Sequence, residues 1–508
     1  MSHLDVQFAE LQSLVTDLGK DGGLISPSIY DTAQITRLYP PPEGPQPALE
    51  WLVQQQHADG GWGEPSAPYA RDVPTLAATL ALHNSPQAPK HRPMIEAGVE
   101  FLEKQAEQWL DLPIDALPIA TEMILPYLLE EAHHAGLMLD RKPYARLYHL
   151  RDRKCRMISA LPLQVNSPPT YSWEALGRAA PSISPDCSGG IGHSPAATAA
   201  WLAQAGDDPD LSNSSTTARQ YLKKAAAATG MGIPGVVPNV WPITGFELSY
   251  GLFALLITDL LQQPMLTKVA KPKIDELALI MQAGKGVSFG DYFTPDVDET
   301  GVALAVLQAT GRPVDPAVVL QFKNGDHFCT FQQELNPSIL ANAHALYSLA
   351  PTGVRYSQAE SFLFHRRCAD GRWLSDKWHS SWLYTTLEVL LAFEQLGYSA
   401  ENRETVNTIL AAQNVDGGWG LPNHSMRMET SYAVIALATL QKQGLLCEYG
   451  KNALQQGQAW LNGTYHPGTL VDNRAWLGKE LYTPYRVDRI YELSALLFAP
   501  LQEGNAIQ

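Results

Sequence analysis

The stretch Gln56-His57-Ala58-Asp59-Gly60-Gly61-Trp62 recurs far downstream as Gln413-Asn414-Val415-Asp416-Gly417-Gly418-Trp419, and a weaker copy ends in Asp370-Gly371-Arg372-Trp373. Each copy follows an apolar helical pattern and turns at Asp-Gly. A further apolar helical pattern comes next, over 76–82, 383–393 and 432–440. Recurring units of helix, turn and helix predict stacked helix pairs.

The spacing of the copies predicts two helical domains. Trp373 and Trp419 are 46 residues apart (419 − 373), which suits one helical hairpin per repeat, whereas Trp62 lies far upstream. Alternating strand patterns are sparse. Contacts of Gln and Trp between helix ends can be purely architectural, so the repeats indicate the fold and not the chemistry. We expect an all-α protein built from two double-layered α/α-barrel domains.

Composition and charge narrow the possible functions. Of 508 residues, 45% are hydrophobic and 17% charged, which is typical of a globular protein with extensive cores. The formal net charge is 36 − 52 = −16, and no Lys/Arg cluster is present, so we expect no nucleic-acid partner. Residues 1–5 do not resemble a signal peptide, and the apolar run 252–261 is too short for a membrane span. We expect a cytoplasmic protein and leave its oligomeric state open.

Three acids fall within four residues at the predicted start of a helix. Asp296, Asp298 and Glu299 precede Thr300 and the apolar residues 301–304. Carboxylates at a helix N-terminus ordinarily cap free amides and complement the helix dipole. If the acids are instead crowded into a buried hollow, at least one pKa rises and a proton is retained near neutral pH. Such an acid can protonate an alkene where apolar and aromatic walls stabilise the cation. Both interpretations stay open at this point.

The stretch Asp296-Val297-Asp298-Glu299-Thr300 resembles the Asp-x-Asp-Asp-Thr motif of class II diterpene and sesquiterpene cyclases. Other stretches match that family in order along nearly the whole chain: 26–33, 59–62, 171–174, 190–196, 337–344, 376–379 and 478–482. The resemblance implies the βγ architecture. A β domain would comprise 1-45 and 281-508, a γ domain would be inserted at 46-280, and the active site would lie where the two barrels meet.

The resemblance also implies the reaction. A linear prenyl diphosphate, either farnesyl or geranylgeranyl diphosphate, is protonated at its terminal double bond. It then closes to a bicyclic drimane- or labdane-type diphosphate, such as drimenyl or copalyl diphosphate. By resemblance, Asp298 is the general acid, Asp296 and Glu299 shape its hydrogen bonding, and Asn342 holds the carbonyl oxygen of the acid.

Glu299 departs from the family pattern, which has Asp at that position. The extra methylene displaces the carboxylate by more than a hydrogen bond tolerates. Glu299 is either the natural residue or an engineered change, and the sequence does not choose between them. We expect Glu299→Asp to raise turnover, and an unchanged or lower rate would remove the idea of a damaged motif.

Binding of the diphosphate is also assigned by resemblance. Glu174 is expected to bind Mg²⁺ and Lys479 to contact the diphosphate, the alternatives being a surface acid and a surface lysine. The turn 189–194, which includes Gly192, could offer backbone amides to phosphate. Candidates for the cavity wall, each of which could instead be core packing, are Trp241, Tyr292, Phe328, Trp378, Trp382 and Tyr384.

The chain lacks an Asp-Asp-x-x-Asp motif, and its nearest mimic, 207–210, has the composition of a solvated turn. The product should therefore keep its diphosphate. Rival interpretations are a squalene-type triterpene cyclase, a protein prenyltransferase subunit with Asp, Cys and His zinc ligands, and a non-catalytic helical-repeat binding protein. The last would have no reason to keep Asp296, Asp298 and Lys479 together. The substrate length, C15 or C20, the stereochemistry of the product and the terminating base stay open.

Overall fold

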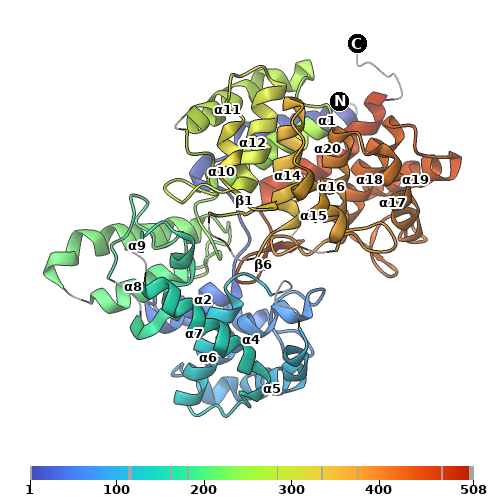
Figure 1. Cartoon of the computed structure of the whole chain (residues 1–508). Coiled ribbons are helices and arrows are strands. Elements are labelled where there is room, and N and C mark those ends of the chain that lie inside the picture. The colour runs from blue at the N-terminus through green and yellow to red at the C-terminus, as the bar shows by residue number, and fades with distance from the viewer. Residues whose placement is uncertain are drawn as a thin grey trace.

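The computed structural model describes residues 3–112, 117–160, 163–179, 182–206, 208–282, 284–332, 334, 336–374, 376–470 and 473–502. These residues are mainly helical, and the helices gather in two bodies (Figure 1). The strands of the described chain form three antiparallel hairpins. Their bounds are Lys323–Asn324 (β1) with His327–Phe328 (β2), Gly420–Leu421 (β3) with His424–Ser425 (β4), and Trp476–Leu477 (β5) with Leu481–Tyr482 (β6).

The first body is a double-layered barrel. Its inner helices are α10 (Thr244–Ile257), α12 (Val297–Ala309), α14 (Ile339–Leu349), α16 (Trp382–Leu396), α18 (Arg427–Lys442) and α20 (Tyr485–Gln502). Each inner helix contacts the next, and α20 closes the ring against α10. Outside them lie α1 (His3–Thr16), α11 (Pro264–Gln282), α13 (Ala317–Leu320), α15 (Ser357–His365), α17 (Ser399–Ala411) and α19 (Glu448–Thr464). The inner helices are apolar on nearly all faces because both layers cover them.

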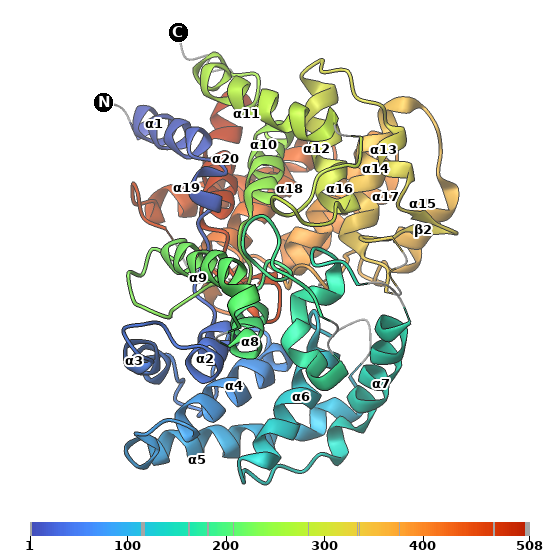
Figure 2. The same ribbon diagram turned by 90° about the vertical axis from the view of Figure 1, so that its left-hand side faces the viewer.

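The second body, which lies below the first barrel in Figure 2, repeats the plan with fewer elements. Its inner ring is α2 (Ile29–Leu38), α4 (Asp72–His83), α6 (Thr121–His134), the 3₁₀ segment η6 (Pro168–Ala179) and α8 (Pro195–Ala205), each in contact with the next and α8 with α2. Outside lie α3 (Gln46–Gln54), α5 (Ala88–Gln105), α7 (Ala145–Ser159) and α9 (Ser212–Ala227). Short 3₁₀ turns connect elements in both bodies. They are η1 (Lys20–Gly22), η2 (Pro68–Ala70), η3 (Ala106–Leu110), η5 (Lys142–Tyr144), η7 (Pro209–Leu211) and η8 (Ala350–Thr352). The predicted all-α, double-layered fold is confirmed.

The repeated tryptophans are architectural, as expected. The indole nitrogen of each donates to a carbonyl ten residues earlier at 2.7 Å: Trp62 to Leu52, Trp373 to Leu363 and Trp419 to Ile409. The backbone amide of each also donates to a threonine hydroxyl on the helix that follows. Each turn therefore joins the end of an outer helix to the start of the next inner helix.

The domain boundaries differ from those expected. Helices α10 and α11, placed in the inserted domain by the sequence, pack with α12, α20 and α1 in the first barrel. Helix α2, placed with the β domain, packs on α4 and α8 in the second barrel. The core of the first barrel combines residues 8–25 with residues from 221 onward, and that of the second spans residues 29–236. The expected boundaries are wrong because the sequence indicates which faces of a helix are apolar but not which helix those faces pack against.

No helix in the described ranges is both long enough and apolar enough to cross a bilayer.

Candidate active site

A cavity lies where the two barrels meet, and about 810 Å³ of space, open solvent included, lies between its walls. The second barrel and its connecting loops contribute Ile119, Pro168, Tyr171, Gly192 and His193. The first barrel contributes the acids of the motif and a group of aromatic side chains. The aromatic lining residues are Tyr171, Phe246, Tyr250, Phe289, Phe293, Phe331, Trp378, Trp476 and Tyr482. Such walls exclude water and offer ring faces to a cation.

The three acids of the motif line this cavity at the first turn of α12. Asp296 is the N-cap, and its Oδ1 accepts a hydrogen bond from the Glu299 amide at 2.9 Å. Burial raises the pKa of Asp296 to about 7. Burial and the neighbouring Asp296 charge raise the pKa of Glu299 well above its usual value, and the two carboxyls share a hydrogen bond. Both interpretations from the sequence therefore hold: the motif caps a helix and forms a buried acid cluster that retains protons.

Asp298 is paired with His344 of the neighbouring helix α14. Nδ1 of His344 lies 2.5 Å from Oδ1 of Asp298, and Nε2 forms an ion pair with Oε2 of Glu388 at 3.1 Å. Burial lowers the pKa of His344, but Asp298 and Glu388 outweigh burial and raise it to about 10. At neutral pH the imidazole is thus a cation that donates a hydrogen bond to Asp298.

The expected role of Asn342 is wrong. Its Oδ1 accepts from the Phe328 amide at 2.8 Å, and its Nδ2 donates to the carbonyls of Phe328 and Ser338. Asn342 therefore fixes the β1–β2 hairpin to α14 and does not hold the acid. Residues two apart on a helix point in nearly opposite directions, so His344 faces α12 where Asn342 cannot.

Of the aromatic candidates, Trp378 lines the cavity, and its Nε1 donates to Thr330 at 3.1 Å. Trp382 does not line the cavity, because it begins α16 on the side where Arg372 stacks over its ring. The expectation that Tyr292 lines the cavity is wrong as well, since 55% of this residue is exposed to solvent. The remaining candidates are buried core residues that do not line the cavity: Trp241, Phe328 and Tyr384.

Lys479 and Glu174 form a buried ion pair, so neither is the surface residue of the alternative interpretation. Nζ of Lys479 lies 2.7 Å from Oε1 of Glu174, 2.6 Å from Ser194 Oγ and 3.5 Å from Asp31 Oδ1. The ammonium also lies 4.8 Å from the ring centre of Tyr171, which lines the cavity although Lys479 does not. Burial raises the pKa of Asp31 to about 6, against the opposing effect of Lys479. The cluster is thus one residue removed from the cavity wall.

The chemistry of this cluster fits a magnesium ion held by few protein ligands. Oε2 of Glu174 is a buried carboxylate oxygen without a hydrogen-bond partner in the described chain. Mg²⁺ commonly takes one or two carboxylates and completes its shell with phosphate oxygens and water. No group of three or more His, Cys, Asp or Glu side chains within the described ranges is arranged to hold a metal. Zinc ligands of the prenyltransferase type are therefore not found there.

The glycine-rich turn has a different role from the one expected. The amides of Gly189, Gly190 and Gly192 already donate within the protein, to Asp186 and Val165, so these three amides are not free for a phosphate. Gly192 has a φ of +57°, and a Cβ at this position would lie 2.3 Å from the Thr170 backbone. The glycine lets the turn approach η6, which carries Tyr171 and Glu174. In the mimic at 207–210, Asp208 and Asp210 are exposed and Asp207 lies outside the described residues.

Comparison with known proteins agrees with this geometry. A family model of the squalene-hopene cyclase C-terminal domain matches residues 336–478. The (+)-kolavenyl diphosphate synthase of Herpetosiphon aurantiacus is 42% identical over 98% of this chain and 99% of its own length. This chain belongs to the class II terpene cyclases. The ent-copalyl diphosphate synthase of a Streptomyces species is 31% identical to this cyclase over 96% of the chain and 95% of its own length.

The fold of this cyclase agrees with a solved structure of the family. The ent-copalyl diphosphate synthase from Streptomyces platensis superimposes with a TM-score of 0.79 and 26% identity, covering 97% of this chain and 99% of that chain. The family assignment sets aside the non-catalytic binding protein and the prenyltransferase. The named relatives also favour a diphosphate cyclase over a squalene-type enzyme.

Sequence reasoning missed several residues around the acid and the lysine of this cyclase. His344 and Asp31 lie in the family-matching stretches 337–344 and 26–33, but the sequence alone suggested no role for either residue. Glu388 lies within the predicted apolar helix 383–393, and a lone glutamate in an apolar helix was the one sign in the sequence that it has a buried partner. His193 also lines the cavity, and its Nε2 lies 3.6 Å from Asp186 in a buried pair. Burial lowers the pKa of His193, against the opposing effect of Asp186.

Proposed function

We propose that this cyclase protonates the terminal double bond of geranylgeranyl diphosphate and closes it to a bicyclic diphosphate. The observation that carries the proposal is the position of Asp298, which is buried in the wall of an aromatic cavity and hydrogen-bonded by His344. The reaction is an isomerisation, since one proton enters and one proton leaves. The diphosphate stays on the product.

The chemistry follows from the charges around Asp298. An alkene is a very weak base, so the acid must be strong in its site and its conjugate carboxylate must be stabilised. The His344 cation supplies that stabilisation through a charge-assisted hydrogen bond. As Asp298 gives its proton to carbon, the new cation meets the faces of Tyr250, Trp476 and Phe246 rather than water.

The C20 substrate is supported by the relatives, whose names are kolavenyl and copalyl diphosphate synthases. Both products are C20 bicyclic diphosphates. Farnesyl diphosphate, with a drimane-type product, is the C15 alternative and an outcome of the test below.

The cluster of Lys479 and Glu174 supports a position for the diphosphate at the Tyr171 end of the cavity. From behind Tyr171, the buried ammonium of Lys479 would supply a fixed positive charge near the phosphate oxygens. Glu174 would hold Mg²⁺ through Oε2, and the bound ion would neutralise charge on the diphosphate. Tyr171 and Gly478, which line the cavity next to Lys479, position the end of the substrate.

The test uses purified protein with geranylgeranyl or farnesyl diphosphate and Mg²⁺. Products are released by phosphatase and identified by gas chromatography and mass spectrometry. We expect bicyclic C20 alcohols, and we expect Asp298→Asn to lower their formation by about 10³-fold. Only C15 products would move the substrate to farnesyl diphosphate. Full activity of Asp298→Asn would refute the mechanism.

A further inference from the structure

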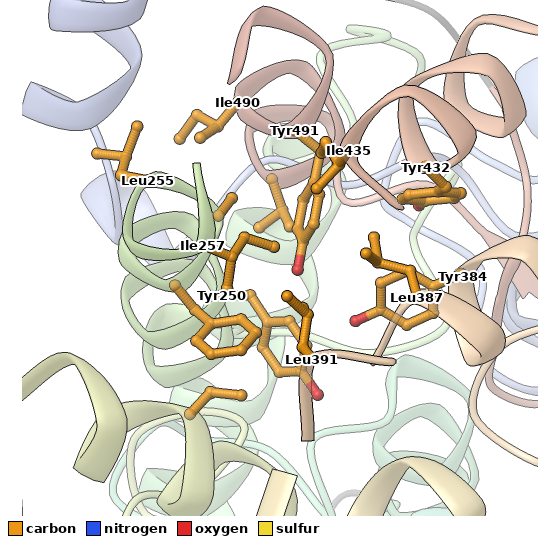
Figure 3. Packing of buried hydrophobic residues seen from close by; sticks show 14 of the residues in the cluster. Tyr250, Leu255, Ile257, Tyr384, Leu387, Leu391, Tyr432, Ile435, Ile490 and Tyr491 are labelled. Atoms are coloured by element: carbon orange, nitrogen blue, oxygen red, sulfur yellow. The ribbon is translucent and has the colours of Figure 1, made fainter. Parts of the chain in front are cut away.

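Three adjacent inner helices each place one ionisable side chain in a row. Asp298 comes from α12, His344 from α14 and Glu388 from α16, and the imidazole lies between the two carboxyl groups. His344 and Glu388 are each 1% exposed. Glu388 is a buried residue of α16, and Leu387 and Leu391 of the same helix lie among the core side chains of Figure 3. A carboxyl group in such an apolar core requires a partner.

The groups that face His344 come from every helix around it. Asp298 faces Nδ1, Glu388 faces Nε2, and the ring of Tyr250 on α10 meets the imidazole edge to face at 5.7 Å. Phe253 of α10 packs at the same distance and cannot titrate. Beyond these neighbours, Tyr491 of α20 donates to Oε1 of Glu388 at 3.5 Å. On the side of Asp298 lie the carboxyls of Asp296 and Glu299. The imidazole is thus the cation that faces these carboxyl groups.

We propose that Glu388 is a positioning residue that keeps both nitrogens of His344 protonated while Asp298 carries the catalytic proton. This inference rests on the function proposed above. A protonated Asp298 is neutral, so it gives His344 no anionic partner. Glu388 is then the anion that balances the imidazolium inside the core.

The alternative protonation states show why this matters. A neutral imidazole has one donor and one acceptor nitrogen. If Nδ1 is the acceptor, the Asp298 proton is held by His344 and is not directed into the cavity. If Nε2 is the acceptor, its lone pair opposes the Glu388 carboxylate. Only the cation donates to Asp298 through Nδ1, keeps a positive charge at ion-pair distance from Glu388 and leaves the Asp298 proton for the substrate.

The proton transfer balances with His344 as a cation throughout. The O–H bond of Asp298 breaks as its proton forms a C–H bond with the terminal alkene carbon, and the π electron pair is consumed. The carboxylate left behind accepts from Nδ1–H at Oδ1, while Nε2–H still faces Glu388. Glu388 therefore acts through His344 and touches no substrate.

The deciding variant is Glu388→Gln, which keeps the size of the side chain and removes its charge. We expect kcat to fall by about 100-fold near pH 8 with KM changed less than about twofold. Asp298 and Glu388 together raise the pKa of His344 against burial, and a protonated Asp298 contributes no charge, so losing Glu388 lowers that pKa while Asp298 holds its proton. His344 then regains its proton as pH falls. The ratio of variant to wild-type activity should therefore rise from about pH 8.5 to about pH 6.

Glu429→Gln is the matched control. Glu429 is a half-buried carboxyl of this barrel, its pKa is raised by burial to about 7, and it accepts from the Ser381 hydroxyl at 2.7 Å rather than pairing with a histidine. We expect this control to leave the activity ratio independent of pH. Glu388→Asp, which restores the charge, should recover at least about tenfold of the lost kcat.

A measurement without substrate separates this inference from the proposed function. Imidazole ¹⁵N shifts, with the His344 signal assigned by its loss in His344→Asn, should report a cation in the wild type near pH 8 and a neutral ring in Glu388→Gln. A ring that stays charged in Glu388→Gln would overturn the inference even if the enzyme is active. So would a loss of activity that is equal at every pH. Failure of the wild type to cyclise any prenyl diphosphate would refute the proposed function, and the ¹⁵N result would still decide the ion pair.

Discussion

Nζ of Lys479 lies 2.7 Å from Oε1 of Glu174, and both side chains have no exposure to solvent. Lys479 follows β5 in the first barrel, whereas Glu174 belongs to η6 of the second, so this ion pair ties the two barrels together. A buried pair of this kind is costly to break from one side, since the remaining charge keeps no partner.

Lys479→Met should therefore destabilise the protein. It leaves Glu174 and Asp31 buried together without a cation, and we expect the free energy of unfolding to fall by about 3 kcal/mol. Urea denaturation at neutral pH measures this change. The double variant Lys479→Met with Glu174→Gln should be more stable than the single variant by at least about 1 kcal/mol. Equal stabilities would show that the pair contributes nothing.

Glu174→Gln tests the magnesium site, while Asp31 remains as a charged partner of Lys479. The amide keeps a hydrogen-bond acceptor but loses the charge that Oε2 offers to a cation. We expect the Mg²⁺ concentration for half-maximal activity to rise about tenfold, with kcat nearly restored at saturating Mg²⁺. An unchanged Mg²⁺ requirement would remove Glu174 as a ligand.

Glu299→Asp addresses the departure from the family motif. The Glu299 carboxyl shares a hydrogen bond with Asp296 and lines the cavity, so the longer side chain is accommodated. This contact favours the outcome opposite to the one expected if Glu299 damages the motif. We expect Glu299→Asp to lower kcat about tenfold, because the shorter side chain loses Asp296. A rise in turnover would restore the idea of a damaged motif.

Trp378 and Trp382 form a matched pair for the cavity wall. Trp378→Leu removes a ring that faces the cavity, and we expect about tenfold slower turnover together with altered products. Trp382→Leu removes a ring of the same size that lies outside the cavity, beside Arg372. Its product profile should match that of the wild type. Product analysis of both variants, normalised to folded protein by circular dichroism, makes the comparison.

Asp72 predicts how stability depends on pH. Its pKa is raised by burial to about 7, although Trp109 and Tyr144 donate hydrogen bonds to its carboxyl. The folded state therefore holds a proton that the unfolded state releases at lower pH, so this group reduces stability as pH rises from about 4 to about 7. Asp72→Asn cannot lose that proton. Between about pH 5 and pH 8 we expect it to lose about 2 kcal/mol less unfolding free energy than the wild type, measured by urea denaturation. Parallel pH profiles would contradict this assignment.

Local pattern determined much about this protein. The repeat ending in Trp62, Trp373 and Trp419 predicted helix pairs, because an indole that bonds the preceding helix and a turn at Asp-Gly are local features. The acid motif predicted a capped helix start for the same reason. The acid motif and the other matching stretches follow one another in the same order as in the family, and this order alone indicated the family.

Tertiary structure decided which side chains meet. Asn342 and His344 both belong to the stretch 337–344. Only the rotation of α14 against α12 decides that His344, and not Asn342, contacts Asp298. Glu388 became part of that site because α16 packs on α14. Packing also decided the domain boundaries and kept Trp382 and Tyr292 out of the cavity wall. Periodicity in a sequence indicates the apolar face of a helix but not the helix that packs against it. A sequence specifies local conformation through nearby residues, whereas the pairing of charges across helices depends on how the barrels close.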